Sequence, residues 1–552
     1  MKDFRSSVIY QIYPKSFLDT DGDGVGDLPG VIQKLDYLQK LGVDCLWLTP
    51  FFPSPQNDNG YDVADYRSVD PRYGTMADLE ELVARAGERG IGVMLDMVFN
   101  HTSTAHPWFQ RALAGDRECQ DCYLFRPGRP EGRAPTNWES KFGGSAWEYV
   151  PGLGQYYLHL FDKTQADLNW ENPRVRREAA DIVRFWMEKG VRGFRFDVVN
   201  LISKGAYADD PEGGDGRRFY TDGPRVHEFL RELNRESFGR DKEIITVGEM
   251  SSTSMENCFR YAGEDGRELT MVFSFHHLKV DFAGNDKWVL LPPDFPKLRQ
   301  LLFSWQEGMA AHGAWNALFW CNHDQPRVVS RFGDEGRYWK ESAKMLANVI
   351  HAMRGTPYIY QGEELGMTNA GFTRLEQYRD VESLNHFAIL RNRGLEEKQV
   401  YRILGAHSRD NSRTPMQWTA GPQGGFTAGE PWIPVNPNAA AINAQSQVDD
   451  PDSIFSHYRA LIRLRKEHPV LARGDFRPLT PDHPAVLAYQ RRLGGSSLVC
   501  VSNFFARDCL WRSPLPLEGY RVLLSSYPSS APSQNWKLRP YESALLLKEE
   551  GL

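Results

Sequence analysis

Residues 193–200 read GFRFDVVN, and this stretch decides the interpretation of the fold. Its apolar residues are typical of a short buried strand, and Arg195 and Asp197 share one face of that strand because side chains alternate. Three other apolar stretches end in similar polar residues: GVMLDMVFNH at 92–101, ITVGE at 245–249 and WNALFWCNHD at 315–324. Polar groups at the ends of several buried parallel strands are typical of the catalytic edge of a TIM barrel.

Eight strand-like runs alternate with amphipathic helices along most of the chain. The runs are residues 8–17, 45–50, 92–100, 193–199, 243–249, 270–275, 315–322 and 356–361. Helices are predicted at 29–41, from a capping box formed by Thr75 and Asp78 onward, at 174–189 and at 454–467. Eight strands alternating with helices predict an α/β fold, the (β/α)8 TIM barrel.

Two segments depart from this alternation and predict additional units. Residues 101–170 are rich in Gly, Pro, Trp and Tyr, which indicates a subdomain inserted after the third strand. The tail contains short alternating runs at 497–502 and 543–547, which favour a small antiparallel β domain. The expected organisation is a catalytic barrel at 1–100 and 171–468, an inserted subdomain at 101–170 and a C-terminal β domain at 469–552.

Composition excludes several classes of function. The net charge of −7 offers no basis for binding nucleic acid or an anionic membrane. No apolar leader and no run of about 20 apolar residues occurs, so a cytoplasmic protein that does not enter the membrane is expected. Seven scattered Cys do not form a disulfide framework, and the single CxxC at 119–122 lacks a second pair for zinc. No organic cofactor is expected.

Two of the carboxylates at the strand ends suit the cleavage of a glycosidic bond. This reaction needs one carboxyl group to attack and another to protonate the leaving oxygen. Asp197 and Glu249 end adjacent strands, which can place their carboxyl groups about 5 Å apart, the distance of a retaining enzyme. Asp197 is then the nucleophile, kept ionised by Arg195, and Glu249 is the acid. Single polar residues at strand ends are usually structural, but four such sets in order on one barrel favour catalysis.

These four segments are similar to the four characteristic sequence regions of the α-amylase superfamily, and the resemblance extends over essentially the whole chain. It implies a catalytic barrel, a subdomain inserted after strand three and a C-terminal β domain. It also implies that Asp197 is the nucleophile, Glu249 the acid/base and Asp324 the stabiliser of the transition state. His101 and His323 are expected to bind sugar hydroxyls beside them.

Further motifs resemble the exo-acting oligosaccharide glucosidases of this superfamily. DNGY at 58–61 and SRTPMQW at 412–418 match that group. The resemblance implies that Asp58 and Tyr61 close the end of a glucose pocket and that Arg413 lies near it. It implies that three residues of the inserted subdomain line the same pocket: Phe142, Phe161 and Gln165. A blocked pocket admits one terminal glucose.

The loop at 19–27 reads DTDGDGVGD and predicts a structural Ca²⁺ site. Alternate carboxylates and one backbone carbonyl can surround a hard cation, as in half of an EF-hand loop. The expected ligands are Asp19, Asp21, Asp23, the Val25 carbonyl and Asp27. Related glucosidases carry calcium in a matching loop. The alternative is an Asp/Gly turn without an ion.

Three features of the sequence narrow the range of expected substrates. Val198 resembles the α-1,6-glucosidases, but Ser251 stands where those enzymes usually have Trp, and residues 271–281 also depart from them. These departures are similar to the phosphotrehalases, which implies hydrolysis of trehalose 6-phosphate to glucose and glucose 6-phosphate. Two alternatives stay open. One is an oligo-1,6-glucosidase, dextran glucosidase or related transglucosylating isomerase, and the other is a catalytically silent transporter subunit.

A phosphorylated disaccharide needs cations on the leaving-group side, because the glucose pocket is closed. Lys279 and Lys287 follow the sixth predicted strand, and His276 stands beside the first of them. Loops after barrel strands share one rim, so these residues are predicted to bind the phosphate. The alternative is that both lysines are solvated loop residues.

Overall fold

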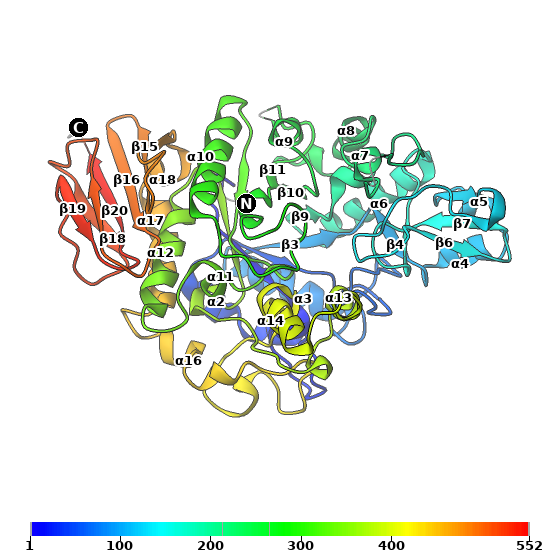
Figure 1. The fold of residues 1–552 in the computed structure, drawn as a ribbon, viewed down its shortest axis with the longest axis horizontal. Helices are drawn as coiled ribbons and strands as arrows, with labels where there is room; N and C mark the ends of the chain where they lie inside the picture. Colours follow the sequence, from blue (N-terminus) through cyan, green and yellow to red (C-terminus); the bar gives the residue numbers. More distant parts are fainter. Residues whose placement is uncertain (1–2, 212–213, 264, 550–552) are drawn as a thin grey trace.

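The computed structural model describes residues 3–211, 214–263 and 265–549 (Figure 1). Eight parallel strands close a barrel in the order β1-β13-β12-β11-β10-β9-β3-β2. Their bounds are β1 Ile9–Ile12, β2 Cys45–Leu48, β3 Gly92–Met97, β9 Gly193–Phe196, β10 Ile245–Glu249, β11 Met271–Phe273, β12 Asn316–Leu318 and β13 Thr356–Tyr360. All eight predicted strands are confirmed. Most are shorter than the apolar runs because the ends of those runs belong to the loops that carry the site.

The register of the central strands aligns the charged residues. Asp96 of β3 pairs with Arg195 of β9, and Arg195 pairs with Val247 of β10. The last pair of the β9–β10 ladder is Phe196 with Gly248, so the next residues along the two strands, Asp197 and Glu249, emerge at the same level. Both lie at the carboxyl edge of the barrel.

Helices surround the barrel. Their bounds include α3 Met76–Glu88, α6 Pro173–Glu188, α8 Val226–Glu236, α10 Phe295–Ala311, α12 Trp339–His351 and α17 Ile454–Glu467. The capping box of Thr75 and Asp78 begins α3 as predicted. The prediction of a single helix at 29–41 is wrong. It is two helices, α1 Leu28–Gln33 and α2 Leu35–Leu41, because Lys34 leaves helical geometry at φ −99° and ψ 7°.

The segment between β3 and β9 forms a small β unit beside the barrel, at the right of Figure 1. β4 His101–Ser103 pairs with β8 Gln165–Asp167. A second sheet has the order β5-β7-β6, with bounds β5 Phe125–Pro127, β6 Trp147–Val150 and β7 Gln155–Leu158. Its apolar core around Trp138 also contains Val198 and Leu201, so it packs against the loop that follows the predicted nucleophile.

The tail is an antiparallel β unit at the opposite end of the molecule (Figure 1). Its five-stranded sheet has the order β14-β15-β16-β20-β18, and β17 pairs with β19. The bounds are β14 Arg477–Pro478, β15 Val486–Leu493, β16 Ser496–Asn503, β17 Cys509–Arg512, β18 Arg521–Ser525, β19 Asn535–Leu538 and β20 Ser543–Glu549. Hydrogen bonds from Asn348 to Ser543 and from Tyr489 to Val349 join it to α12.

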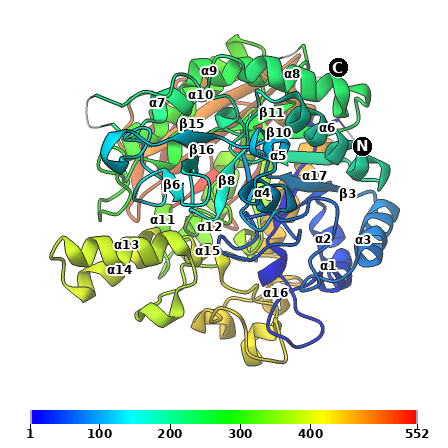
Figure 2. The same ribbon diagram turned by 90° about the vertical axis from the view of Figure 1, so that its right-hand side faces the viewer.

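Two helices after β13 form a hairpin that projects from the barrel (Figure 2). They are α13 Val381–Asn392 and α14 Glu397–His407. Asn385 of α13 donates a hydrogen bond to the carbonyl of Phe142 in the inserted unit, so the hairpin and the insertion meet above the barrel. In the parts of the chain that the structure describes, no helix is both long and apolar enough to cross a membrane.

Candidate active site

A cavity opens at the carboxyl edge of the barrel. Residues predicted from sequence line much of it: Asp58, Tyr61, His101, Phe142, Phe161, Gln165, Asp197, Glu249, Lys279, Lys287 and Asp324. Arg195, His323 and Arg413 lie buried next to it, with at most 1% of each residue exposed. His276 does not line the cavity. The sequence patterns therefore identified most of the walls.

Arg195 holds three carboxylates together beneath the cavity. Its Nη1 donates to Asp96 Oδ1 at 2.6 Å and to Asp197 Oδ1 at 2.7 Å, and its Nη2 donates to Glu249 Oε2. Sequence reasoning paired Arg195 with Asp197 alone and missed Asp96. A charged residue inside the apolar run at 92–97 was the available signal. Burial raises the pKa of Asp96 to about 7 despite the guanidinium.

Asp324 is held as a carboxylate. Burial opposes its charge, but the positive charges of Arg409 and Arg413 hold the pKa of Asp324 well below its usual range. Arg413 Nη2 donates to Asp324 Oδ1 at 2.6 Å, and Arg409 Nη1 lies 3.4 Å from the same oxygen. A permanent anion at this position can stabilise positive charge that develops on a sugar ring.

His323 is neutral and presents a free donor. Burial lowers its pKa to about 3, and Gln11 Nε2 donates to its Nδ1 at 2.8 Å. The proton therefore lies on Nε2, which makes no hydrogen bond within the described ranges and lies 3.4 Å from Asp324 Oδ2. This N–H is therefore an unused donor buried next to the cavity.

Asp58 closes one end of the cavity. Its Oδ1 accepts from Arg409 Nη2 at 2.9 Å and its Oδ2 from Gln165 Nε2 at 3.1 Å. Burial raises the pKa of Asp58 to about 7 in spite of the nearby guanidinium groups. The Phe142 ring covers Arg409, and the Arg409 Cζ atom lies 4.9 Å from the centroid of that ring. A buried ion pair covered by an aromatic ring therefore forms the cavity lining at Asp58.

Arg409 was missed by the sequence analysis, which selected Arg413. Both arginines are buried, but only Arg409 lines the cavity. Arg413 donates a hydrogen bond to Asp324 instead. The two positions are four apart, one helical turn, across the short helix α15 Asp410–Arg413. This spacing was the signal that could have identified Arg409.

The loop that carries Asp58 has an unusual backbone. Gln56, Asn59 and Gly60 have φ of 67°, 49° and 103°, all in the left-handed region. Lys15 Nζ donates to Gln56 Oε1 at 3.1 Å and to Asn59 Oδ1 at 2.9 Å, and so connects the two strained residues on either side of Asp58. Sequence reasoning missed Lys15, because nothing local relates it to a loop 41 residues away.

Two lysines also line the cavity, one of them beside the segment that follows Glu249. Lys141 and Lys279 both line it, and Lys141 Nζ donates to Ser251 Oγ at 3.1 Å. Burial, together with the positive charges of Arg217 and Lys279, lowers the pKa of Lys141 to about 7. Burial also lowers the pKa of Lys279, which makes no ion pair with any residue the structure describes. Like charges near one another favour an anionic ligand.

Two residues predicted to bind phosphate are less suited to it. Lys287 forms an ion pair with Glu382 at 2.7 Å, so its charge is already balanced. His276 packs against Trp305 with ring centroids 5.2 Å apart, and burial lowers its pKa to about 4. It is therefore neutral near pH 7. Lys141 was missed, because it comes from the inserted unit, 138 positions before Lys279 (279 − 141).

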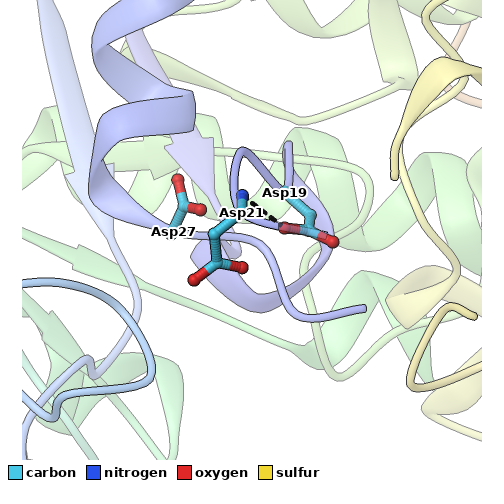
Figure 3. Close-up of side chains that lie close together, drawn as sticks. All are labelled: Asp19, Asp21 and Asp27. Carbon is cyan, nitrogen blue, oxygen red and sulfur yellow. Dashed lines mark hydrogen bonds between the residues drawn. The ribbon is translucent and has the colours of Figure 1, made fainter. Parts of the chain in front are cut away.

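Three of the five predicted calcium ligands lie together. Asp19, Asp21 and Asp27 each place a carboxylate oxygen within 4.8 Å of the other two (Figure 3). Asp23 instead accepts from the Val25 N–H at 2.7 Å and is not part of this group. Asp19 also accepts from Gly22 N and Gly24 N, both at 2.8 Å. Three carboxylates suit a hard cation such as Ca²⁺.

Comparisons with known proteins agree with this geometry. Residues 11–474 match the α-amylase catalytic domain. The trehalose-6-phosphate hydrolases of Bacillus subtilis (strain 168) and Escherichia coli (strain K12) are each 54% identical to the chain. The first match covers 98% of this chain and 97% of the relative, and the second covers 99% of both.

A solved structure is also similar. It is the crystal structure of Bacillus licheniformis trehalose-6-phosphate hydrolase. It is 53% identical, with a TM-score of 0.95, and the match covers 99% of this chain and 100% of that one. The family match and the carboxylate arrangement lead to one conclusion: the chain belongs to the α-amylase family of glycoside hydrolases.

Proposed function

We propose that the chain is a retaining, exo-acting α-glucosidase that hydrolyses trehalose 6-phosphate to glucose and glucose 6-phosphate. The observation that carries this proposal is the charge of the cavity lining. The Asp58–Arg409 ion pair lines the cavity, and so do Lys141 and Lys279, neither of which pairs with a carboxylate of the described residues. A neutral glucose suits the balanced ion pair, and the phosphate of the second glucose suits the two lysines. The similarity to the trehalose-6-phosphate hydrolases supports the same substrate.

The chemistry is a double displacement. Asp197 attacks the anomeric carbon of the bound glucose while Glu249 transfers its proton to the leaving oxygen, which departs as glucose 6-phosphate. Glu249 then takes a proton from water, whose oxygen displaces Asp197 and releases glucose. Asp324 stabilises the positive charge of each transition state, and His101 and His323 orient the ring. Arg195 keeps Asp197 in place through the bond at 2.7 Å.

The phosphate binds Lys141 and Lys279 in this proposal. A phosphate monoester carries a charge of about −1.5 to −2 near pH 7 and requires fixed cations. These lysines belong to the inserted unit and to the loop after β11, so a substrate bridges both parts of the protein. Lys287 and His276, with a balanced charge and a neutral ring, contribute less than the sequence suggested.

A substrate panel tests the proposal. Trehalose 6-phosphate, trehalose and isomaltose are offered at equal concentrations, and glucose release is followed. The proposal expects trehalose 6-phosphate to have the highest kcat/KM by at least about tenfold, as one or more charge-assisted hydrogen bonds would give. Preference for isomaltose would contradict it and favour the oligo-1,6-glucosidase alternative.

We also propose a structural Ca²⁺ held by Asp19, Asp21 and Asp27, away from the reacting atoms, and a cytoplasmic location. A charged sugar phosphate does not cross a lipid bilayer unaided, so its hydrolase belongs where the substrate is retained. No nucleic acid or membrane partner is needed for this activity.

A further inference from the structure

One side chain joins the two catalytic strands beyond the point where their ladder ends. Asn200, three residues after Asp197, is fully buried. Its Nδ2 donates to the Ser251 carbonyl at 2.8 Å, and its Oδ1 accepts from the Ser251 N–H at 2.9 Å. Ser251 is two residues after Glu249. A single amide thus makes the pair of opposed hydrogen bonds that a neighbouring strand would make.

The backbone cannot make this connection by itself. The β9–β10 ladder ends at Phe196 and Gly248. Val198 then adopts φ 34° and Ser252 adopts φ 57°, and both values are in the left-handed region that side chains disfavour. The chain therefore turns one residue after Asp197 and three residues after Glu249. Asn200 links the two segments at Ser251, before the second turn.

Asp222 fixes the orientation of Asn200. Its Oδ1 accepts from Asn200 Nδ2 at 3.2 Å, and its backbone N–H donates to the Asn200 carbonyl at 3.0 Å. The same carboxylate accepts from the side chains of three residues that follow Glu249: Thr253, Asn257 at 2.9 Å and Tyr261 at 2.6 Å. Asp222 therefore anchors Asn200 and the segment after Glu249 to one point.

The two catalytic carboxylates do not depend on this network equally. Asp197 is held independently, because its N–H donates to the Met97 carbonyl at 3.0 Å and its Oδ1 accepts from Arg195. Glu249 pairs with Phe273 of β11 and has the Arg195 contact, but the chain that follows it is fixed through Asn200 and Asp222. Loss of Asn200 should displace Glu249 more than Asp197.

We propose that Asn200 is a positioning residue that sets the place of Glu249 relative to Asp197, with Asp222 holding it in orientation. This inference rests on the roles of Asp197 and Glu249 in the proposed function. A retaining mechanism requires a carboxyl separation of about 5–5.5 Å, and a displacement of about 1 Å can lower the rate roughly a hundredfold.

The test separates proton donation from nucleophilic attack. Trehalose 6-phosphate needs a proton on its leaving oxygen, whereas fluoride leaves α-glucosyl fluoride with little help from an acid. Asn200→Ala should lower kcat/KM for trehalose 6-phosphate by about a hundredfold and for α-glucosyl fluoride by less than about tenfold. Glu249→Gln, measured in parallel, should show the same difference in a stronger form.

A matched control is Asn348→Ala. Asn348 is also fully buried, and its amide bonds to Ser543 and His457, at the contact with the C-terminal β unit. This variant should lower the melting temperature and leave the ratio of the two kcat/KM values unchanged. If Asn200→Ala fails to fold, Asp222→Asn tests the same link and should shift the ratio in the same direction.

Three outcomes decide the matter. A larger loss on trehalose 6-phosphate than on the fluoride, in a folded Asn200 or Asp222 variant, supports the proposal. Equal losses on both substrates, while Glu249→Gln shows the difference, overturn the role of Asn200 and leave the catalytic assignment intact. If Glu249→Gln also shows equal losses on the two substrates, both the role of Asn200 and the assignment of Glu249 as the acid are overturned.

Discussion

At the residue scale, the cations of the site differ in whether a neighbouring carboxylate balances their charge. Arg195, Arg409 and Arg413 each face carboxylates and act as fixed supports. Lys141 bonds only to a hydroxyl within the described ranges, and Lys279 has no anionic partner there. Groups whose charge is unbalanced before substrate arrives are the ones available to an anionic substrate.

Removing either unbalanced lysine should therefore weaken binding of the phosphate alone. Lys279→Ala and Lys141→Ala are each expected to raise KM for trehalose 6-phosphate by about tenfold, as for one charge-assisted hydrogen bond of about 1.5–3 kcal/mol. KM for plain trehalose should barely change. Lys340→Ala, which removes a surface lysine paired with Asp452, is the control. Equal effects on both sugars would move the phosphate site elsewhere.

The lowered pKa of Lys141 predicts a pH dependence. An ammonium group loses its proton as pH rises through its pKa, here about 7, so the cation is present below this pH and lost above it. The phosphate has a second pKa of about 6 and stays doubly charged from about pH 7 to 8.5. The ratio of KM for trehalose 6-phosphate to KM for trehalose should rise several-fold over this range. Lys141→Arg should flatten it, and a flat ratio in the unaltered enzyme would contradict the role of Lys141.

Sequence could identify residues at strand ends but not those that arrive by tertiary contact. Asp197, Glu249 and Asp324 each end a recognisable apolar run, so the barrel alone brings them together. Lys141 reaches the site from the inserted unit, and Lys15 acts on a loop far along the chain. Local patterns contain no information about such contacts. The ion pair of Lys287 could not be predicted for a related reason, since its partner Glu382 lies 95 positions away.

At the element scale, the loop at 56–60, which carries Asp58, has a strained backbone that Lys15 stabilises. Two left-handed residues other than glycine, Gln56 and Asn59, cost free energy, and the Lys15 ammonium bonds to both of them. The loop then presents Asp58 to Arg409 and Gln165. In the proposed function this pocket holds the glucose of each substrate, whatever its leaving group.

Lys15→Met should consequently lower kcat/KM for trehalose 6-phosphate and for trehalose by the same factor, about tenfold, because both place glucose in this pocket. Lys15→Arg keeps the charge and should recover part of the loss. Lys34→Met is a matched control. Lys34 and Lys15 both lie over a tryptophan, 4.2 Å from Nζ to the ring centroid, but only Lys15 of the two bonds to the loop at 56–60 in the described structure. A loss confined to the phosphorylated sugar would contradict this account of Lys15.

The helix predicted at 29–41 shows a limit of periodicity at the element scale. Its apolar residues do recur at helical spacing, but Lys34 interrupts the backbone and α1 and α2 bury separate faces. Gly30 lies so close to Leu18 that an added Cβ would be 2.1 Å from the Leu18 carbonyl oxygen. This tertiary contact is invisible to a pattern of apolar residues.

At the scale of the whole molecule, the loop at 19–27 contacts a distant part of the chain, residues 426 and 427. Asp19 accepts a hydrogen bond from Thr427, and the N–H of Asp19 donates to the Phe426 carbonyl at 3.0 Å. Three carboxylates close together repel one another when no cation is present. Calcium binding should therefore stabilise the folded protein globally.

Chelation should lower the melting temperature, and added Ca²⁺ should restore it, because a ligand that binds only the folded state stabilises it by mass action. Asp21→Asn, at an exposed position of the group, should reduce the response to Ca²⁺. Kinetic constants measured below the melting temperature should change little. A melting curve unaffected by thorough chelation and by added Ca²⁺ would rule out the site.

The most direct test of the central claim follows the products of one reaction by proton NMR. Trehalose 6-phosphate is added to the enzyme, and the anomeric signals are recorded before mutarotation. Double displacement by Asp197 and Glu249 predicts glucose 6-phosphate and glucose in equal amounts, with the glucose from the closed pocket appearing first as the α-anomer. Initial release of β-glucose would contradict the retaining mechanism, and the absence of glucose 6-phosphate would contradict the proposed substrate.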